Sequence, residues 1–253
     1  MLKALENLID PYNLRARLFP AFLVLLPLGC VIAAWVPIEI QALGALGSVA
    51  ATLGIATLFQ QLVRDAGKRV EPELYGRWGG KPSVRMLHYA HSSVNHQTLA
   101  RCHAKVRESA PELAIPGSIE EEAKHPVEAL TAYESASDLL VAKTRGKEKF
   151  ALLFEENMNY GYRRNIWGLK TWGITTALVG SGVVTVRVVT LWLRTQELAV
   201  VPSVAGVVCV VIALFWSLTV NSDWVRRAAD VYAHRLVLSA DEIDSPKKAD
   251  GPK

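Results

Sequence analysis

The sequence lacks the short motifs by which most enzymes are recognised. Its 253 residues contain no GxxxxGK(S/T) phosphate-binding loop, no HExxH zinc motif and no Ser-His-Asp or Cys-His constellation. Cysteine is also scarce, and Cys30, Cys102 and Cys209 have neither a CxxC partner nor zinc-finger spacing. We therefore interpret the three cysteines as small packing residues. We expect neither an enzyme nor a bound cofactor or metal.

Charged side chains are missing from four long stretches. Residues 18–38, 40–63 and 198–222 contain no acidic or basic residue, and residues 171–193 contain Arg187 alone. About 20 apolar helical residues cross the hydrocarbon of a bilayer, and a helix satisfies every backbone polar group within one segment. The sequence therefore predicts an all-α integral membrane protein. Four transmembrane helices form two hairpins, with a helical cytoplasmic insert between them.

This interpretation divides the chain into six parts. They are an interfacial N-terminal segment (1–17), transmembrane hairpin 1 (18–64), a cytoplasmic helical insert (65–170), transmembrane hairpin 2 (171–222), a cytoplasmic helix (223–240) and a disordered tail (241–253). The first apolar run has no convincing small-residue cleavage site, so we expect it to remain as a span. Lys and Arg near span ends are retained in the cytoplasm, which predicts that both termini and the insert are cytoplasmic.

The net charge of +4 is too small to indicate a nucleic-acid partner, but the charges are unevenly distributed. Residues 64–107 hold nine basic and three acidic side chains, residues 108–138 hold one and eight, and residues 143–170 hold seven and three. Anionic headgroups attract juxtamembrane bases by roughly 1 kcal/mol each, so we expect the basic flanks to contact membrane lipids. The acidic middle of the insert should lie away from the membrane.

The insert lacks the period-two alternation of a β-strand and has helical spacing instead. A helix following Pro126 is expected to turn four residues inward: Leu130, Tyr133, Leu139 and Leu140. Small residues recur on one face of two predicted spans, which allows a neighbouring helix to approach closely. These helix-packing residues are Gly44, Gly47, Ala51 and Gly54 in the second span, and Gly173, Ala177 and Gly180 in the third. We expect close packing within the protomer or in a homo-oligomer.

Four histidines, at positions 88, 91, 96 and 103, fall within sixteen residues. His96 and His103 can share one helical face, but zinc needs a third or fourth ligand at a fixed geometry. No His-plus-carboxylate motif supplies that ligand. We therefore expect polar surface or interface histidines in preference to a metal site.

A glycine pair with neighbouring cations occurs in the segment VEPELYGRWGGKPSVRML, residues 70–87. Such a turn can expose backbone N–H groups to a phosphate. The alternative is an interfacial loop in which tryptophan and the basic side chains contact headgroups. The residues expected to make phosphate or headgroup contacts are Arg69, Arg77, Trp78, Gly79, Gly80, Lys81 and Arg85.

Arg187 is the residue least suited to a membrane span. An ionised side chain near the bilayer centre costs at least about 2.5 to 3.5 kcal/mol unless it is paired or hydrated. One hypothesis is that Arg187 extends to the outer headgroups. The other is that it faces a pore or an oligomer axis, where it would favour anions.

Two segments resemble the corresponding parts of a group of bacterial four-span membrane proteins with a cytoplasmic helical insert between spans two and three. They are EPELYGRWGGKPSVRML (71–87) and KFALLFEENMNYGYRRN (149–165), and the similarity covers most of residues 40–170. The resemblance implies the bacterial inner membrane. It brings no catalytic residue, because the group has no settled activity. The layout is also similar to that of flagellar-motor stator subunits, in topology alone.

These observations favour a homo-oligomeric membrane effector or channel. Its insert would sense a cytoplasmic protein partner or small ligand, and its spans would alter membrane permeability. The bacterial resemblance suggests a context of stress or antiphage defence. The alternative is a non-conducting scaffold that anchors a soluble partner through the acidic middle of the insert. A membrane-bound enzyme, which would rest on the histidines and the glycine turn, is the least favoured hypothesis.

Overall fold

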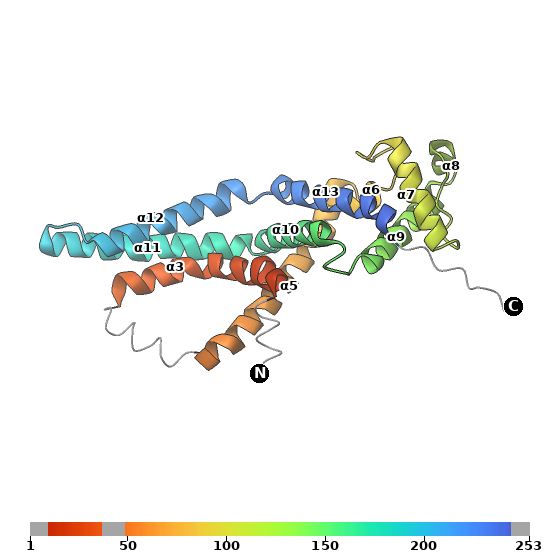
Figure 1. The fold of residues 1–253 in the computed structure, drawn as a ribbon. Helices are drawn as coiled ribbons and strands as arrows, with labels where there is room; N and C mark the ends of the chain where they lie inside the picture. Colours follow the sequence, from red (N-terminus) through yellow and green to blue (C-terminus); the bar gives the residue numbers. More distant parts are fainter. Residues whose placement is uncertain (1–9, 37–48, 244–253) are drawn as a thin grey trace. The chain divides into compact units, whose positions relative to one another are not determined.

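Every regular element in the described part of the chain is helical. The computed structural model describes residues 10–36 and 49–243, with the backbone alone for residues 49–55 (Figure 1). Three helical segments there are long and apolar enough to cross a membrane: Pro11–Trp35, Lys170–Thr195 and Val200–Thr219. The chain is therefore an all-α, membrane-associated protein with three candidate spans among the described residues. The predicted second span, 40–63, lies partly outside them.

The contacts divide the chain into two compact units. Unit 1 comprises Met1–Pro72 and Gly161–Val225, and unit 2 comprises Glu73–Tyr160 and Arg226–Lys253. Three helices contribute residues to both units: α5 (Val49–Trp78), α10 (Ala151–Gly168) and α13 (Ser222–Leu238). The predicted limits of the insert, 65 and 170, fall within α5 and at the first residue of α11.

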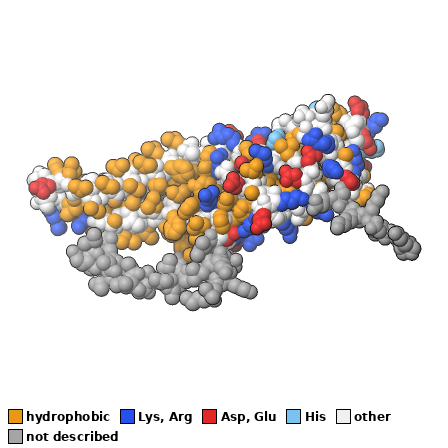
Figure 2. Space-filling model, viewed as in Figure 1, with side chains coloured by type: hydrophobic (Ala, Val, Ile, Leu, Met, Phe, Trp, Pro, Cys, Tyr) orange, Lys and Arg blue, Asp and Glu red, His pale blue; other side chains and the backbone are white. Residues whose placement is uncertain are grey.

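Unit 1 contains the three candidate spans. The first consists of α2 (Pro11–Asn13), η1 (Leu14–Leu18) and α3 (Phe19–Trp35), the second is α11 (Lys170–Thr195), and the third is α12 (Val200–Leu214) with η2 (Phe215–Thr219). α3, α11 and α12 pack against one another. Large apolar side chains such as Phe22, Leu178 and Val207 remain exposed on their outer faces (Figure 2). An outward apolar surface suits a hydrocarbon environment and would be costly in water.

Small residues on α11 allow close approach of α3 and α12. A Cβ atom at Gly173 would overlap the Trp216 ring, and one at Gly180 would lie 2.9 Å from the Pro27 Cβ. Ala177, between them on the same face, is fully buried. These three residues therefore contact helices of the same chain. Four helix-packing residues were predicted in the second span. Gly44 and Gly47 lie outside the described residues, and for Ala51 and Gly54 the structure describes only the backbone.

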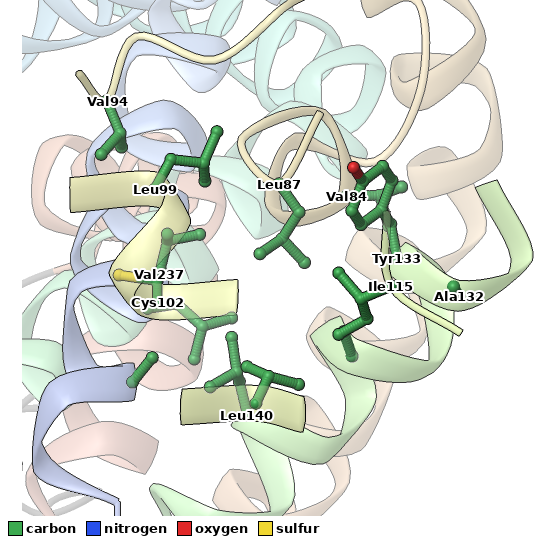
Figure 3. Packing of buried hydrophobic residues seen from close by; sticks show 14 of the residues in the cluster. Val84, Leu87, Val94, Leu99, Cys102, Ile115, Ala132, Tyr133, Leu140 and Val237 are labelled. Carbon is green, nitrogen blue, oxygen red and sulfur yellow. The ribbon is translucent and has the colours of Figure 1, made fainter. Parts of the chain in front are cut away.

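Unit 2 is built around short helices that share one hydrophobic core. They are α6 (Pro82–Arg85), α7 (His96–Ser109), α8 (Ile119–Lys124), α9 (Pro126–Lys143) and η3 (Ser239–Glu242), together with parts of α5, α10 and α13. Side-chain caps begin two of the helices: the Thr98 N–H donates to Asn95 Oδ1 at 2.9 Å, and the Glu121 N–H donates to Ser118 Oγ at 3.3 Å. The core is formed by residues of α6, α7, α9, α10, α13 and η3 and of the segments between them, and Figure 3 shows Leu99, Leu140 and Val237 facing a common interior.

Candidate functional site

The glycine pair that follows α5 terminates the helix. Gly79 and Gly80 have φ angles of 76° and 122°, in the region that favours glycine. The Gly80 N–H donates to the Tyr75 carbonyl at 2.8 Å, which satisfies one of the last carbonyl groups of α5. α6 then begins at Pro82, where a missing N–H removes no helical hydrogen bond. The turn therefore has a structural role that accounts for both glycines.

Several side chains around this turn contact groups of the same unit. The Trp78 ring is only 5% exposed, so most of it packs inside the protein. Arg77 pairs with Glu73 at 2.7 Å, and Lys81 pairs with Asp138 at 2.9 Å. Two cations predicted to contact phosphate thus have acidic partners already. The other two cations predicted to contact phosphate are Arg69 in unit 1 and Arg85 in unit 2. Neither forms an ion pair among the described residues.

The four clustered histidines differ in their exposure to solvent. His91 and His96 are exposed, His88 is partly buried and His103 is fully buried. Across residues 10–36 and 49–243, no group of three or more His, Cys, Asp or Glu side chains could hold a metal ion. His88 and His103 belong instead to a polar network inside unit 2.

Glu122 is the centre of that network. Its side chain accepts hydrogen bonds from the Tyr89 N–H at 2.8 Å, the Tyr133 hydroxyl at 2.9 Å and His88 Nδ1 at 3.1 Å. Burial opposes ionisation of Glu122, which is 8% exposed, but these donors outweigh burial and the pKa of Glu122 is lowered. Glu122 is therefore a carboxylate that fastens α8 to α9 and to the segment before α7.

The His103 ring packs against the two tyrosines of the same network. Its Nε2–H donates to the Leu87 carbonyl at 2.9 Å, and its ring lies 4.9 Å from the Tyr89 ring and 5.4 Å from the Tyr133 ring. Burial lowers the pKa of His103 to about 4, so the ring is neutral at physiological pH. His103 Nδ1 has no hydrogen-bond partner within the described structure. These enclosed groups support a structural role for His88 and His103.

Arg187 has partners at the end of α3. Its Nε donates to the Ala34 carbonyl at 3.2 Å, and its guanidinium carbon lies 4.9 Å from the Trp35 ring centroid. The last carbonyls of a helix lack intrahelical donors and attract cations, and tryptophan is enriched at membrane interfaces. These contacts favour the hypothesis that Arg187 sits near a headgroup region.

A groove on the surface of unit 2 lies between α9 and the loop that follows α7. It has a volume of about 340 Å³ and is lined by Glu112, Leu113, Ala114, Val127, Glu128, Thr131, Ala132 and Ser135. We call this the α9 groove. Val127 is 72% exposed there, and Leu130, which follows on α9 but does not line the groove, is 44% exposed. Water-exposed apolar side chains of this size mark a surface that can bind another molecule.

The rim of the α9 groove is acidic. Glu112 and Glu128 line it, and Glu134 follows on the exposed face of α9. None of the ion pairs among the described residues involves these three glutamates. The groove therefore offers apolar surface and uncompensated negative charge together, which is the complement of a basic, amphipathic binding partner.

The sequence did not indicate this groove, because Leu130 was expected to face inward. The buried stripe of α9 is formed instead by small and aromatic residues: Ala129, Ala132, Tyr133, Ala136, Ser137 and Leu140. Leu130 lies at the edge of that stripe. The alanines at positions 129, 132 and 136 are the signal from which the buried face could have been identified.

No protein-family model, curated protein or solved structure matches this chain. The function must therefore be inferred from its own contacts, burial and charges. Among the described residues, the α9 groove and the outer faces of the candidate spans are two surfaces with exposed large apolar side chains.

Proposed function

We propose that this protein is a membrane-anchored scaffold that binds a soluble protein partner in the α9 groove. The observation that carries the proposal is the combination of exposed Val127 and Leu130 with three acids that have no ion pair among the described residues. Single exposed apolar residues are common on protein surfaces, but a group of them rimmed by charge is typical of a binding site.

The chemistry of the groove defines the partner. An amphipathic helix can insert one or two large apolar side chains at Val127 and Leu130, and its flanking Lys or Arg can approach Glu112 and Glu128. Such charge pairs mainly set the association rate and the choice of partner, whereas the buried apolar anchors supply most of the affinity. The expected partner segment is therefore basic on one side and apolar on the other.

The anchor consists, in this proposal, of four membrane spans. Residues 40–63 form the second, and the exposed Leu58 and Leu62 of α5 support an apolar surface there. The one-sided distribution of Lys and Arg supports cytoplasmic termini and a cytoplasmic unit 2. Location in a bacterial inner membrane rests on the resemblance of residues 71–87 and 149–165. A cytoplasmic unit 2 would present the α9 groove to soluble proteins.

Photo-crosslinking in intact cells tests the scaffold function. p-Benzoylphenylalanine is introduced at Val127 or Leu130 and, as the matched control, at Val231, an exposed valine of α13 in the same unit. We expect the two groove positions to yield an adduct with one protein that contains a basic amphipathic segment. The control position should yield no such adduct. Equal adducts at all three positions, or none at the groove, would contradict the proposal.

A homo-oligomeric effector that changes membrane permeability is the second candidate. It is supported by Gly29 on α3 and Gly182 on α11, which are exposed and have no heavy atom within 4 Å of an added Cβ. The described residues give no reason for glycine at these positions, whereas a second copy packing there would. Gly182→Ile should then abolish both disulfide-trapped oligomers and any dye leakage, without affecting membrane insertion. An unchanged oligomer, or the absence of leakage in the wild type, would exclude this candidate.

A further inference from the structure

A buried polar node lies at the start of the first candidate span in unit 1. Asn165, only 1% exposed, donates from Nδ2 to the Ala16 carbonyl at 2.6 Å and accepts from Arg164 Nη2 at 3.1 Å. Arg164 Nη1 also donates to Glu71 Oε1 at 2.6 Å. The node thus joins η1, α5 and α10. The charges of Arg164 and Glu71 compensate each other within it.

Glycines hold the three elements close together at this node. A Cβ at Gly67 of α5 would overlap the Asn165 side chain, and a Cβ at Gly161 of α10 would lie 2.8 Å from the Tyr12 hydroxyl oxygen. The backbone around Ala16 therefore cannot move away from α5 and α10 without breaking this packing.

Two arginines flank the node, and neither forms an ion pair among the described residues. Arg17 follows Ala16, and Arg64 lies one helical turn before Gly67 on α5. The Arg17 guanidinium lies 5.5 Å from the Tyr12 ring centroid, is repelled by Arg64 and Arg164, and is attracted by Asp10. Neither Arg17 nor Arg64 takes part in an ion pair or a side-chain hydrogen bond within the described structure. Nearby Glu71 is engaged by Arg164, so it cannot compensate both charges.

We propose that Arg17 and Arg64 bind a phosphate group, carried by an anionic phospholipid or free in solution. Guanidinium groups donate paired N–H bonds that match phosphate oxygens, and two of them held close together are stabilised by an anion between them. The site lies at the end of an apolar segment of 25 residues, where lipid headgroups meet a span. Exposed Phe19 and Phe22 of α3 continue from it and offer an apolar surface to acyl chains.

This site is distinct from the glycine turn at residues 79 and 80, and it does not depend on the scaffold function. Its test uses native mass spectrometry of the purified full-length chain in detergent. The probes are phosphatidylglycerol, phosphatidylcholine and inorganic phosphate, each added separately. The variants are Arg17→Gln, Arg64→Gln and Arg17→Lys. The control is Arg194→Gln, an exposed arginine of α11 without an ion pair among the described residues.

We expect wild-type protein to retain phosphatidylglycerol over phosphatidylcholine. Arg17→Gln and Arg64→Gln should each weaken retention about tenfold, because each removes a charge-assisted hydrogen-bond donor. Arg17→Lys should retain part of the binding, and Arg194→Gln should behave as wild type. Phosphatidylglycerol retention that inorganic phosphate does not reduce assigns the site to a lipid. Binding of inorganic phosphate itself, lost in the same two variants, assigns it to the free anion.

Two results would overturn the proposal. One is equal retention of both lipids with no binding of inorganic phosphate. The other is a loss of retention in Arg194→Gln as large as in Arg17→Gln, which would indicate a diffuse charge effect. Circular dichroism of each variant verifies that the helices are intact, and a second pair, Arg17→Lys with Arg64→Lys, replaces any variant that does not fold.

Discussion

The Tyr133 hydroxyl donates a hydrogen bond to the buried Glu122 carboxylate at 2.9 Å, and this bond joins α9 to α8. α9 carries the exposed face of the groove on its other side, while the loop after α7 forms the opposite wall. The position of the groove walls therefore depends on the polar network inside unit 2. Stability and partner binding are expected to be coupled through this network.

Glu122→Gln should destabilise unit 2 by about 1 to 3 kcal/mol, because a buried acceptor of three hydrogen bonds becomes an amide with one acceptor oxygen. Chemical denaturation followed by tryptophan fluorescence and circular dichroism measures the change. Glu134→Gln is the control, since Glu134 is exposed on α9 and forms no ion pair among the described residues. Equal free energies of unfolding for the two variants would mean that the hydrogen bonds of Glu122 do not stabilise unit 2.

Acidification should weaken unit 2 before its carboxylates titrate. The pKa of His103 is about 4 in the folded state against an ordinary value of 6.5, so below pH 6.5 the unfolded chain binds a proton that the folded chain does not. The free energy of unfolding is therefore highest above pH 6.5 and falls by about 2 kcal/mol when the pH is lowered to 5. Unfolding midpoints at several pH values measure this slope.

The matched variant for that experiment is His103→Gln, which keeps a donor for the Leu87 carbonyl but does not titrate. Its stability at pH 7 is expected to be lower than that of the wild type, and its slope between pH 6.5 and 5 should be flatter. A slope as steep as in the wild type would assign the pH dependence to another group.

Gly173→Ala should disturb the packing of α11 on η2, because the added methyl group overlaps the buried Trp216 ring. Overpacking of this kind costs about 1 to 3 kcal/mol. Gly182→Ala adds the same methyl group where no atom lies within 4 Å, so it should be neutral or slightly stabilising. Thermal unfolding in detergent compares the two. Equal melting temperatures would show that the α11–Trp216 contact is not tight.

Arg187→Leu should weaken the contact between α11 and the end of α3 without creating or removing a membrane current. The cation–π contact with Trp35 predicts a coupling of about 0.5 to 1 kcal/mol in a double-mutant cycle of Arg187→Leu and Trp35→Leu. Thermal unfolding of the four proteins measures this coupling. A current that depends on Arg187 in planar bilayers would instead support the pore hypothesis.

The sequence predicts some elements of this fold more securely than others. The runs 18–38, 171–193 and 198–222, which hold no charge except Arg187, predict the three candidate spans that the structure places at 11–35, 170–195 and 200–219, because a bilayer demands length and apolarity alone. The sequence could not predict which helix packs against Gly173. A small residue indicates that another helix can approach closely, but it does not indicate which one. Trp216 is 43 residues away in sequence and becomes its neighbour through the fold.

The sequence predicts the negative charge of the α9 groove but not its apolar surface. The acidic stretch 108–138 indicates a surface that repels anions, but it does not reveal that Val127 and Leu130 are exposed within it. Their exposure depends on the rotation of α9, which Tyr133, Leu140 and the surrounding core determine. The partners of Glu122 are equally invisible in sequence, since Tyr89 and Tyr133 lie 33 and 11 residues away from it.

Reversal of charge at the groove tests the scaffold account most directly. The measurement is the yield of the Val127 photo-crosslink in cells that produce Glu112→Lys with Glu128→Lys, compared with Glu148→Lys with Glu155→Lys, two exposed acids of unit 2 outside the groove. The account predicts that the groove reversal lowers the yield about tenfold or more, since it replaces two attractive contacts by repulsion, and that the second pair leaves it unchanged. An undiminished Val127 adduct in the groove variant would contradict it.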